Sequence, residues 1–338
     1  MFSLDSDVHG TRGAIALAER LGAAYDHTKG HALVNQIALY TNHGGFFTTP
    51  TETRRRADMI VIVGDIPAAH HDLVVSWRSV SPDLTTARQR TWYHLKGAVP
   101  SAEAGKSDSL AQRVKAHSVA SGDLPLGGVL GVARAVMAGK QVSTILPEID
   151  RFAGALAKAA FPVFVFSGDA KDPSSPVMLQ GLVADINKSR RASALFLPSD
   201  DDAWGTVLTS LWMTGFPPRT SFSTGMPIYD PLLWNIDRMI VDREADLHVW
   251  ISERGSEQPQ SRVKVPLIAV RASDGPVARA SVTFRIGRTG VDHDGVVYSS
   301  RIGTFKAVAA AAPSDLPNVS QIMRQLAEAL PGGGVLPC

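Results

Sequence analysis

Unbroken apolar runs and helically spaced apolar residues alternate along the first two thirds of the chain. The run Met59 to Val63 predicts a buried strand over 58–64, the first strand of the chain, because a strand covered on both faces shows no polar alternation. Further strands are predicted over 161–167 and 192–198, and QRTWYHL is β-like. Helical spacing predicts helices at 13–23, 31–41, 109–118, 126–138, 147–160, 176–187 and from a capping Asp200 or Asp201 to about 213.

The pattern changes after residue 214. The stretch GFPPRTSFSTGMPIYDP, residues 215–231, has four prolines and no periodicity, which predicts a linker or a site loop. Beyond it we expect a helix at 232–240, strands at 245–252, 266–272 and 280–286, a turn-rich stretch at 287–300 and a last helix at 317–330. Strands that alternate with helices favour an α/β fold with parallel sheets covered on both faces.

An acid follows the strand at 58–64. This strand ends in Gly64 and Asp65, and Pro67 then predicts the start of a helix. In open α/β sheets, ligands bind in the crevice outside the carboxyl ends of the strands. Phosphate-bearing ligands need backbone N–H groups and positive charge there. A carboxylate offers neither of these, so Asp65 does not suit such a ligand. We expect the Asp65 carboxylate instead to cap the following helix or to face a partner.

Composition excludes several classes of function. The chain has 34 Lys and Arg against 32 Asp and Glu in 338 residues, so it lacks the positive field that concentrates nucleic acid or an anionic membrane. Its single cysteine, Cys338, cannot form an intrachain disulfide, a cysteine-type zinc site or an iron–sulfur cluster. The sequence shows no secretory signal and no apolar run of the roughly 20 residues that span a bilayer. It predicts a cytoplasmic protein with no nucleic-acid or membrane partner.

Two groups of His and Asp raise the question of a metal site. His70, His71 and Asp72 follow Asp65, and these residue types bind zinc and similar ions. Adjacent residues on a helix point about 100° apart, so a capped helix start with solvated histidines is favoured over a hydrolytic metal site. The stretch VDHDG, residues 291–295, is favoured as a hairpin turn because Asp-Gly is a turn pair.

The proline-rich stretch holds a candidate interface. Arg219, Phe222, Met226 and Tyr229 combine an arginine with aromatic and sulfur-containing side chains, a composition enriched at the cores of protein interfaces. We predict that these four residues contact another subunit rather than form an active site. The arginines at 54–56 are favoured as a solvated helix face, with the binding of an acidic carrier as the alternative. No G-x-G-x-x-G, P-loop or G-x-S-x-G motif occurs.

Four stretches, in order along the chain, resemble one known family. RRRADMIVIVGDIPAAHHDL is similar to a family segment in which a strand ends at WGxNPAxxHP, and FPVFVFSG through ALFLP resembles the next pair of strands. WMTGFPP resembles the loop that follows, and EADLHVWISE through VYSSRIG resembles the closing half. Together these stretches span most of residues 10–330. The family is that of the formylmethanofuran dehydrogenase B subunits, among the molybdopterin and tungstopterin oxidoreductases.

The chain departs from that family where the cofactors are held. Family members carry a four-cysteine iron–sulfur segment and a Cys or selenocysteine that ligates the metal, whereas YDHTKGHALVNQ offers only Asp26 as an oxygen ligand. At strand ends that receive the pyrophosphate of the pterin, this chain places Asp65, Asp169 and Asp200–Asp202. Two like charges about 4 Å apart repel by roughly 4 kcal/mol at an effective dielectric of 20. The resemblance therefore implies an inherited fold with no cofactor, no metal and no catalytic residue.

A shortened, cysteine-poor chain of this kind is similar to B subunits of the formyltransferase/hydrolase complexes of methylotrophic bacteria. The resemblance implies two Rossmann-like doubly wound domains, one inserted in the other, with residues 1–42 and 201–330 around 43–200 and a flexible tail at 331–338. It implies a non-catalytic scaffold beside an amidohydrolase-like hydrolase subunit, a formyltransferase subunit and a further small subunit. Such complexes release formate from formyl-tetrahydromethanopterin through a methanofuran-type carrier. The alternatives are an active molybdenum or tungsten oxidoreductase with an oxygen ligand, and a hydrolase built on Asp65 and the His pair.

Overall fold

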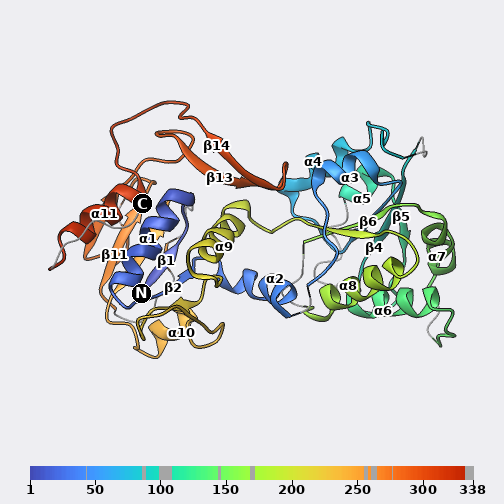
Figure 1. Cartoon of the computed structure of the whole chain (residues 1–338), viewed down its shortest axis with the longest axis horizontal. Helices are drawn as coiled ribbons and strands as arrows, with labels where there is room; N and C mark the ends of the chain where they lie inside the picture. Colours follow the sequence, from blue (N-terminus) through green and yellow to red (C-terminus); the bar gives the residue numbers. More distant parts are fainter. Residues whose placement is uncertain are drawn as a thin grey trace. The chain divides into compact units, whose positions relative to one another are not determined.

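In the computed structural model the chain forms two compact units (Figure 1). Unit 1 contains Met1–Leu33, Asp200–Ser299 and the chain from Thr304 onward, and unit 2 contains Val34–Ser199 and Ser300–Gly303. The described residues are 1–42, 44–85, 89–98, 109–143, 146–167, 172–254, 258–259, 265–275 and 277–331. Both units combine parallel strands with helices, which confirms the α/β fold class. The expected domain limits stay predictions, and the tail expected at 331–338 lies, except for its first residue, outside the described residues.

Unit 1 is built on a seven-stranded sheet in the order β12-β11-β10-β1-β2-β8-β9. The strands from β12 to β2 run parallel, and β8 and β9 add an antiparallel edge. The strands are β1 (Phe2–Leu4), β2 (Ala24–His27), β8 (Thr220–Ser221), β9 (Ile228–Tyr229), β10 (His248–Ser252), β11 (Leu267–Arg271) and β12 (Val282–Arg285). The helices are α1 (Val8–Arg20), the start of α2 (Gly30–Asn42), α9 (Asp201–Thr214), α10 (Ile236–Val241) and α11 (Val319–Glu328). The proline-rich stretch thus contributes two short strands to the sheet.

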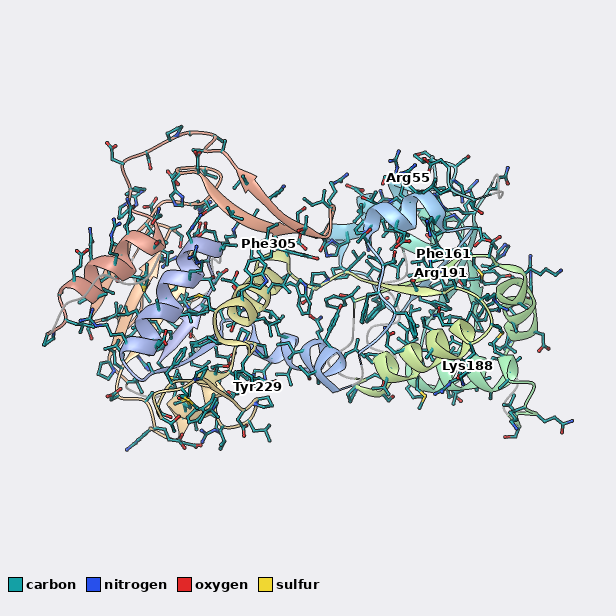
Figure 2. All side chains as sticks on the ribbon, viewed as in Figure 1. Arg55, Phe161, Lys188, Arg191, Tyr229 and Phe305 are labelled. Atoms are coloured by element: carbon teal, nitrogen blue, oxygen red, sulfur yellow. The ribbon has the colours of Figure 1, made fainter. Side chains whose placement is uncertain are left out.

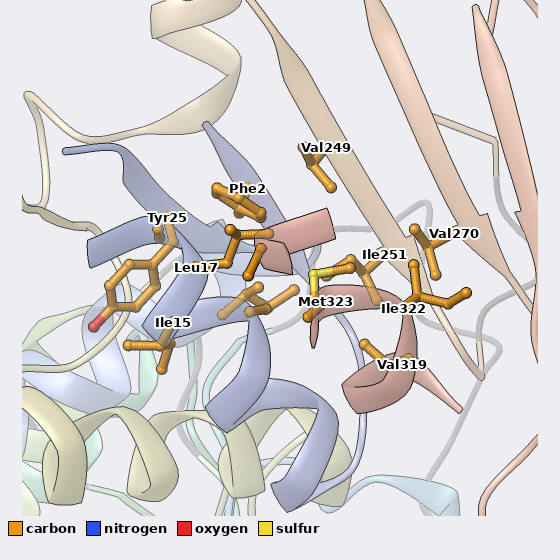
Figure 3. Close-up of a cluster of buried hydrophobic side chains, with 14 of the residues drawn as sticks. Phe2, Ile15, Leu17, Tyr25, Val249, Ile251, Val270, Val319, Ile322 and Met323 are labelled. Carbon is orange, nitrogen blue, oxygen red and sulfur yellow. The ribbon is translucent and has the colours of Figure 1, made fainter. Parts of the chain in front are cut away.

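Helices α1 and α11 cover one face of this sheet (Figure 3). The buried cluster between them and the strands includes Phe2, Leu4, Ile15, Leu17, Tyr25, Val249, Ile251, Val270, Val319, Ile322 and Met323. The two helices approach closely at Gly10, where a Cβ atom would lie 2.7 Å from the Cβ of Val319. Helix α1 begins at Val8, earlier than the 13–23 prediction, because Asp7 caps it and Gly10 allows α11 to pack against its first turn.

Two strands precede the one predicted to be the first. Strands β1 and β2 have only three and four residues, too few to show a clear pattern. Strand β2 also reads AYDH, yet Asp26 and His27 are 2% and 1% exposed. The prediction is wrong here because these polar side chains are buried against partners in the folded chain.

Unit 2 is built on a five-stranded parallel sheet in the order β5-β4-β3-β6-β7. The strands are β3 (Met59–Val63), β4 (Thr91–Leu95), β5 (His117–Val119), β6 (Pro162–Phe166) and β7 (Ser193–Phe196). The helices are the rest of α2, α3 (Pro50–Arg56), the 3-10 helix η1 (Ala68–His70), α4 (His71–Ser76), α5 (Ser109–Val114), α6 (Leu126–Met137), α7 (Ile149–Lys158) and α8 (Ser174–Asn187). The predicted helix 109–118 is wrong at its end, because Lys115 takes a positive φ of 54° and β5 follows. Within the described part of the chain, no helix is long and apolar enough to cross a membrane.

The turn-rich stretch at 287–300 contains the first strand of a hairpin. Strand β13 (Gly295–Ser299) pairs antiparallel with β14 (Thr304–Val308), and the two form one ribbon in Figure 1. The chain turns earlier as well, between Thr289 and His293, which form an isolated bridge. The VDHDG stretch is therefore a turn as predicted, but it is not the loop that joins the two strands of the hairpin.

Candidate functional site at the carboxyl ends of the strands

Two helices of unit 1 begin beside the carboxyl ends of its parallel strands. At the start of α1, the Asp7 carboxylate accepts a hydrogen bond from the Gly10 N–H at 2.8 Å. At the start of α9, the Asp200 carboxylate accepts from the N–H groups of Asp202 and Ala203 at 2.9 and 3.0 Å. These are the groups that an anionic ligand would need. Each helix start is therefore filled by a carboxylate of the chain itself.

In unit 2 a single carboxylate serves two helices. Asp172 accepts a hydrogen bond from the Gly127 N–H, in the first turn of α6, at 2.8 Å. Its other oxygen accepts from the N–H groups of Ser174 and Ser175, at the start of α8, each at 3.2 Å. Although desolvation works in the opposite direction, hydrogen bonds from Ser174 and the backbone lower the pKa of Asp172. Its negative charge therefore stays between the two helix starts at neutral pH.

A buried ion pair joins β2 to the proline-rich stretch. Asp26 and Arg219 are 2% and 5% exposed, and the Arg219 Nε donates to an Asp26 oxygen at 3.2 Å. The same oxygen accepts from the Ile236 N–H at 3.4 Å, and the other accepts from the His27 N–H at 2.7 Å. Desolvation raises the pKa of Asp26 to about 6, although Arg219 and these hydrogen bonds oppose the shift. Both carboxylate oxygens are thus already used inside the chain.

A second buried carboxylate, that of Glu253, joins β10 to two other segments. Glu253 is 1% exposed. One of its oxygens accepts from the Ser6 hydroxyl at 2.7 Å and from the Asp7 N–H at 3.1 Å, and the other accepts from the Thr289 N–H at 2.6 Å. Hydrogen bonds to an ionised acceptor are stronger than neutral ones. Glu253 therefore holds together the end of β10, the start of α1 and the turn at Thr289.

Acids outnumber cations around the start of α9, where Asp5, Asp200, Asp202 and Glu253 lie near Lys29 and Arg254. Lys29 pairs with Asp200, and the Arg254 Nε lies 3.2 Å from an Asp202 oxygen. Desolvation raises the pKa of Asp202 to about 7, with Arg254 opposing and neighbouring carboxylates adding to the shift. Burial lowers the pKa of His27 to about 4, so its imidazole is neutral. This edge of the sheet lacks the net positive charge that attracts phosphate.

Comparisons with known proteins show that the chain is similar to a subunit of a known complex. The B subunit of the formyltransferase/hydrolase complex of Methylorubrum extorquens is 27% identical over 321 residues, which cover 93% of this chain and 84% of that protein. A crystal structure of the formyltransferase/hydrolase complex from M. extorquens, in complex with methylofuran, matches with a TM-score of 0.82 and 26% identity, over 96% of this chain and 88% of that one. The chain is homologous to the B subunit of this complex.

A more distant similarity extends to an oxidoreductase. The B subunit of the tungsten-containing formylmethanofuran dehydrogenase 2 of Methanocaldococcus jannaschii is 23% identical over 316 residues, which cover 87% of this chain and 70% of that protein. No protein-family model matches the chain. The two curated relatives confirm the family resemblance found in the sequence.

The residues of this chain do not fit the metal and pterin that the resemblance brings with it. Asp26 is the candidate oxygen ligand, but its two oxygens accept from Arg219 and from two backbone N–H groups. A metal ion would have to displace these donors within a buried site. N–H groups at the starts of α1, α9, α6 and α8, which are the kind of groups that bind phosphate, already donate to carboxylates of the chain itself.

The acids that fill the helix starts differ in part from the predicted ones. Asp200 caps α9, as predicted. Asp65 is exposed, and the helical segment that follows it has no side-chain cap, so its predicted capping role is wrong. Asp169 lies outside the described residues. Asp7 and Asp172 are absent from the predicted set. Asp7 is the N-cap of α1, which is the ordinary signal of an Asp just before a helix, whereas Asp172 precedes Pro173, the N-cap of α8.

The residues of the alternative hydrolytic site are held apart. The His70 Nε2 lies 2.7 Å from the Pro198 carbonyl oxygen, whereas the His71 ring binds the carbonyl oxygen of Ile66 at 2.9 Å. His70 is 5% exposed, so the prediction of a solvated side chain is wrong for it. Asp72 pairs with an arginine at 2.7 Å. Across the described ranges, no three His, Cys, Asp or Glu side chains are placed to hold a metal ion.

The three arginines at 54–56 are exposed or half-buried on α3. Arg55, labelled in Figure 2, donates to both carboxylate oxygens of Asp83 at 3.1 and 3.0 Å. Arg56 lies 3.6 Å from Glu52 one turn earlier in the same helix. Two of the three charges are thus balanced within the chain, which favours the solvated helix face over the acidic carrier.

The four residues of the candidate interface divide into two buried and two accessible ones. Arg219 and Phe222 are buried, and the Phe222 ring stacks on Tyr25 with the centroids 6.0 Å apart. Met226 is exposed and Tyr229, labelled in Figure 2, is half-buried. The buried pair thus supports the β8–β9 hairpin from inside. Contact with another subunit stays a prediction for all four.

The Asp202→Asn variant is expected to gain stability relative to the wild type as the pH rises. The pKa of Asp202 is about 7 in the folded chain against an ordinary value of 3.8. Between these values the unfolded chain releases the proton while the folded chain retains it, so ionisation destabilises the fold progressively as the pH rises. The free energy of unfolding of the variant should therefore gain on that of the wild type from about pH 4 to about pH 7, and not beyond. Urea unfolding over this range measures the difference, with Asp201→Asn as control; a difference independent of pH would contradict the assignment.

Proposed function

We propose that this chain is a non-catalytic structural subunit of a formyltransferase/hydrolase complex that releases formate from formyl-tetrahydromethanopterin through a methanofuran-type carrier. The proposal is supported by homology to the B subunit of such a complex over 93% of the chain and by the match to a solved complex that holds methylofuran. Its proposed partners are an amidohydrolase-like hydrolase subunit, a formyltransferase subunit and a further small subunit. The proposed location is the cytoplasm.

The filled helix starts carry the non-catalytic part of the proposal. Asp7, Asp200 and Asp172 use the N–H groups that would bind the phosphates of a cofactor. A phosphate about 4 Å from such a carboxylate would be repelled by roughly 4 kcal/mol at an effective dielectric of 20. That repulsion corresponds to roughly a thousandfold in affinity. The fold therefore supports a scaffold better than a cofactor-dependent catalyst.

An active molybdenum or tungsten subunit is the less well supported alternative. It needs an oxygen ligand, and the oxygens of Asp26 are engaged by Arg219 and two backbone N–H groups. It also needs net positive charge at the carboxyl edge of the sheet to bind the pterin phosphates. At that edge Asp200 and Asp202 neutralise Lys29 and Arg254.

Gentle purification from the native host tests the proposal. We expect the chain to co-purify with hydrolase and formyltransferase subunits, and elemental mass spectrometry to find no stoichiometric Mo or W on this chain. The whole complex is analysed first, and the chain is then separated and measured again so that metals of partner subunits are not assigned to it. Near-stoichiometric Mo or W on this chain would overturn the non-catalytic role, and an isolated monomer would overturn the complex.

Asp65→Asn is expected to change neither the formate-releasing activity of the assembled complex nor the stability of the chain. Asp65 is exposed, and the helical segment after it has no side-chain cap that the substitution would remove. A hydrolase that used Asp65 as a general base would lose activity by about a hundredfold or more. Formate release by the purified complex decides between these outcomes. Asp123→Asn, at another exposed acid of unit 2, is the matched control.

A further inference from the structure

An apolar surface of unit 1 extends from the end of α9 to the β8–β9 hairpin and the residues after it. Trp212, Met226 and Leu232 are 64%, 69% and 75% exposed. Phe216, Ile228 and Leu233 are exposed on the same segment of the chain. Single exposed apolar side chains are ordinary, but a group of large ones marks a surface that binds something. We call these six residues the α9 apolar surface.

Ring contacts connect the parts of this surface. The Phe216 ring, just after α9, stacks on Tyr229 of β9 with the centroids 6.4 Å apart and the planes inclined by 8°. Trp212 contacts Phe305 of β14, labelled in Figure 2, with the centroids 4.7 Å apart. One contact thus joins the end of α9 to β14 and the other joins the residue after α9 to β9, so parts of the surface are held in place before any partner binds. Such preorganisation lowers the entropic cost of association.

The α9 apolar surface belongs to a segment almost without charge. From Ala203 to Trp234 the only charged residues are Arg219 and Asp230. The Arg219 guanidinium is buried with Asp26 and also donates to a backbone carbonyl at 2.6 Å. The Asp230 carboxylate accepts from two N–H groups just after it, each at 2.8 Å. Both charges are therefore engaged within the segment or beneath it.

The lack of charge defines the chemistry of the partner. Arg238 borders this surface, where its guanidinium donates to the carbonyl oxygens of Leu232 and Leu233 and pairs with Glu244. Because that charge is already paired, an ionised side chain pressed against the surface would lose its water without gaining a free counter-ion, which favours a matching face that is apolar as well. Interfaces depleted of charge at their centre and rich in aromatic residues and Met are typical of permanent assemblies. The homologous structure is a complex of four different subunits, which favours a different subunit over a second copy of this chain as the occupant.

We propose that the α9 apolar surface is a permanent interface with another subunit of the formyltransferase/hydrolase complex, with Trp212 and Leu232 as its anchors. This inference rests on the proposed function and deepens it, since it assigns the surface through which the scaffold is held. Arg219 and Phe222 belong to the interface only indirectly, because they are buried beneath it.

The test uses Trp212→Arg and Leu232→Arg in the full chain, co-expressed with the other three subunits of the complex from its own host. Both side chains are mostly exposed, so each variant should keep the thermal midpoint of the isolated chain. Val282→Arg is the matched control: Val282 is 45% exposed on β12, at the opposite edge of the same sheet. We expect each anchor variant to bind the other subunits about thirtyfold more weakly or worse, and the control to assemble as the wild type does.

The outcomes separate this inference from the proposed function. If the wild type assembles and the two anchor variants assemble equally well, the interface assignment is overturned while the proposed function stands. If the wild type fails to join any of the other three subunits, the proposed function itself fails. If light scattering instead shows a dimer of this chain that the anchor variants disperse, a second copy covers the surface and the assignment to another subunit is overturned.

Discussion

Arg219→Met is expected to lower the free energy of unfolding by about 3–5 kcal/mol at pH 7.5, the usual cost of removing one partner of a buried ion pair. The Asp26 carboxylate is 2% exposed and would keep two backbone donors but no cation. Urea unfolding measures the loss.

The pH dependence of this loss identifies its cause. Desolvation raises the pKa of Asp26 to about 6 in the wild type, and the loss of Arg219 must raise it further. The charge-dependent part of the destabilisation is therefore complete above the pKa of the variant and disappears as the pH falls below about 6, where both proteins bind the proton. Asp26→Asn combined with Arg219→Met should recover more than half of the loss at pH 7.5. An equal loss at every pH would assign the effect to packing instead.

Glu253→Ala is expected to lower the free energy of unfolding by about 3 kcal/mol or more, since three buried donors are left unsatisfied and each costs about 1–3 kcal/mol. The Ser6 hydroxyl and the N–H groups of Asp7 and Thr289 all donate to this carboxylate. With the carboxylate removed, the end of β10 loses its connection to the start of α1 and to the turn at Thr289.

Denaturant unfolding and amide hydrogen exchange together measure this effect. We expect the amides of Asp7 and Thr289 to lose protection before those of the central strands. Glu253→Gln should lose less, because its amide oxygen still accepts, and Glu244→Ala, at an acid outside the core, should lose little. Unchanged exchange at Thr289 in Glu253→Ala would show that the turn does not depend on this contact.

Long apolar runs made the centre of unit 2 predictable. MIVIV and PVFVF are strands because every residue in them is buried, and such runs contain no competing signal. Unit 1 was less predictable, because β1 is short and β2 contains Asp26 and His27. A buried polar residue follows no local periodicity when its partner is distant in the sequence. Arg219 is 193 residues from Asp26, so neither the strand nor the burial of the arginine could be inferred locally.

The candidate site shows the same division between local and distant information. Asp200 was predictable as a cap because the N–H groups it accepts from lie two and three residues later. The link from Asp172 to Gly127 spans 45 residues and depends on how two helices of unit 2 converge. Composition alone indicated that residues 215–231 are suited to contact another protein. It could not distinguish Met226, which is exposed, from Phe222, which is buried in the core.

The carboxylates at the helix starts also determine how readily this fold could acquire a phosphate ligand. A side chain tethered beside the N–H groups competes at an effective concentration of about millimolar or more, and a free phosphate ester would have to exceed it. A new lysine nearby would pair with the resident aspartate before it recruited a ligand. Acquisition of such a ligand at α1 or α9 must therefore begin with loss of Asp7 or Asp200, which leaves the helix without its N-cap and the fold about 1 kcal/mol less stable. The first step towards phosphate binding is thus destabilising, and selection for stability opposes it.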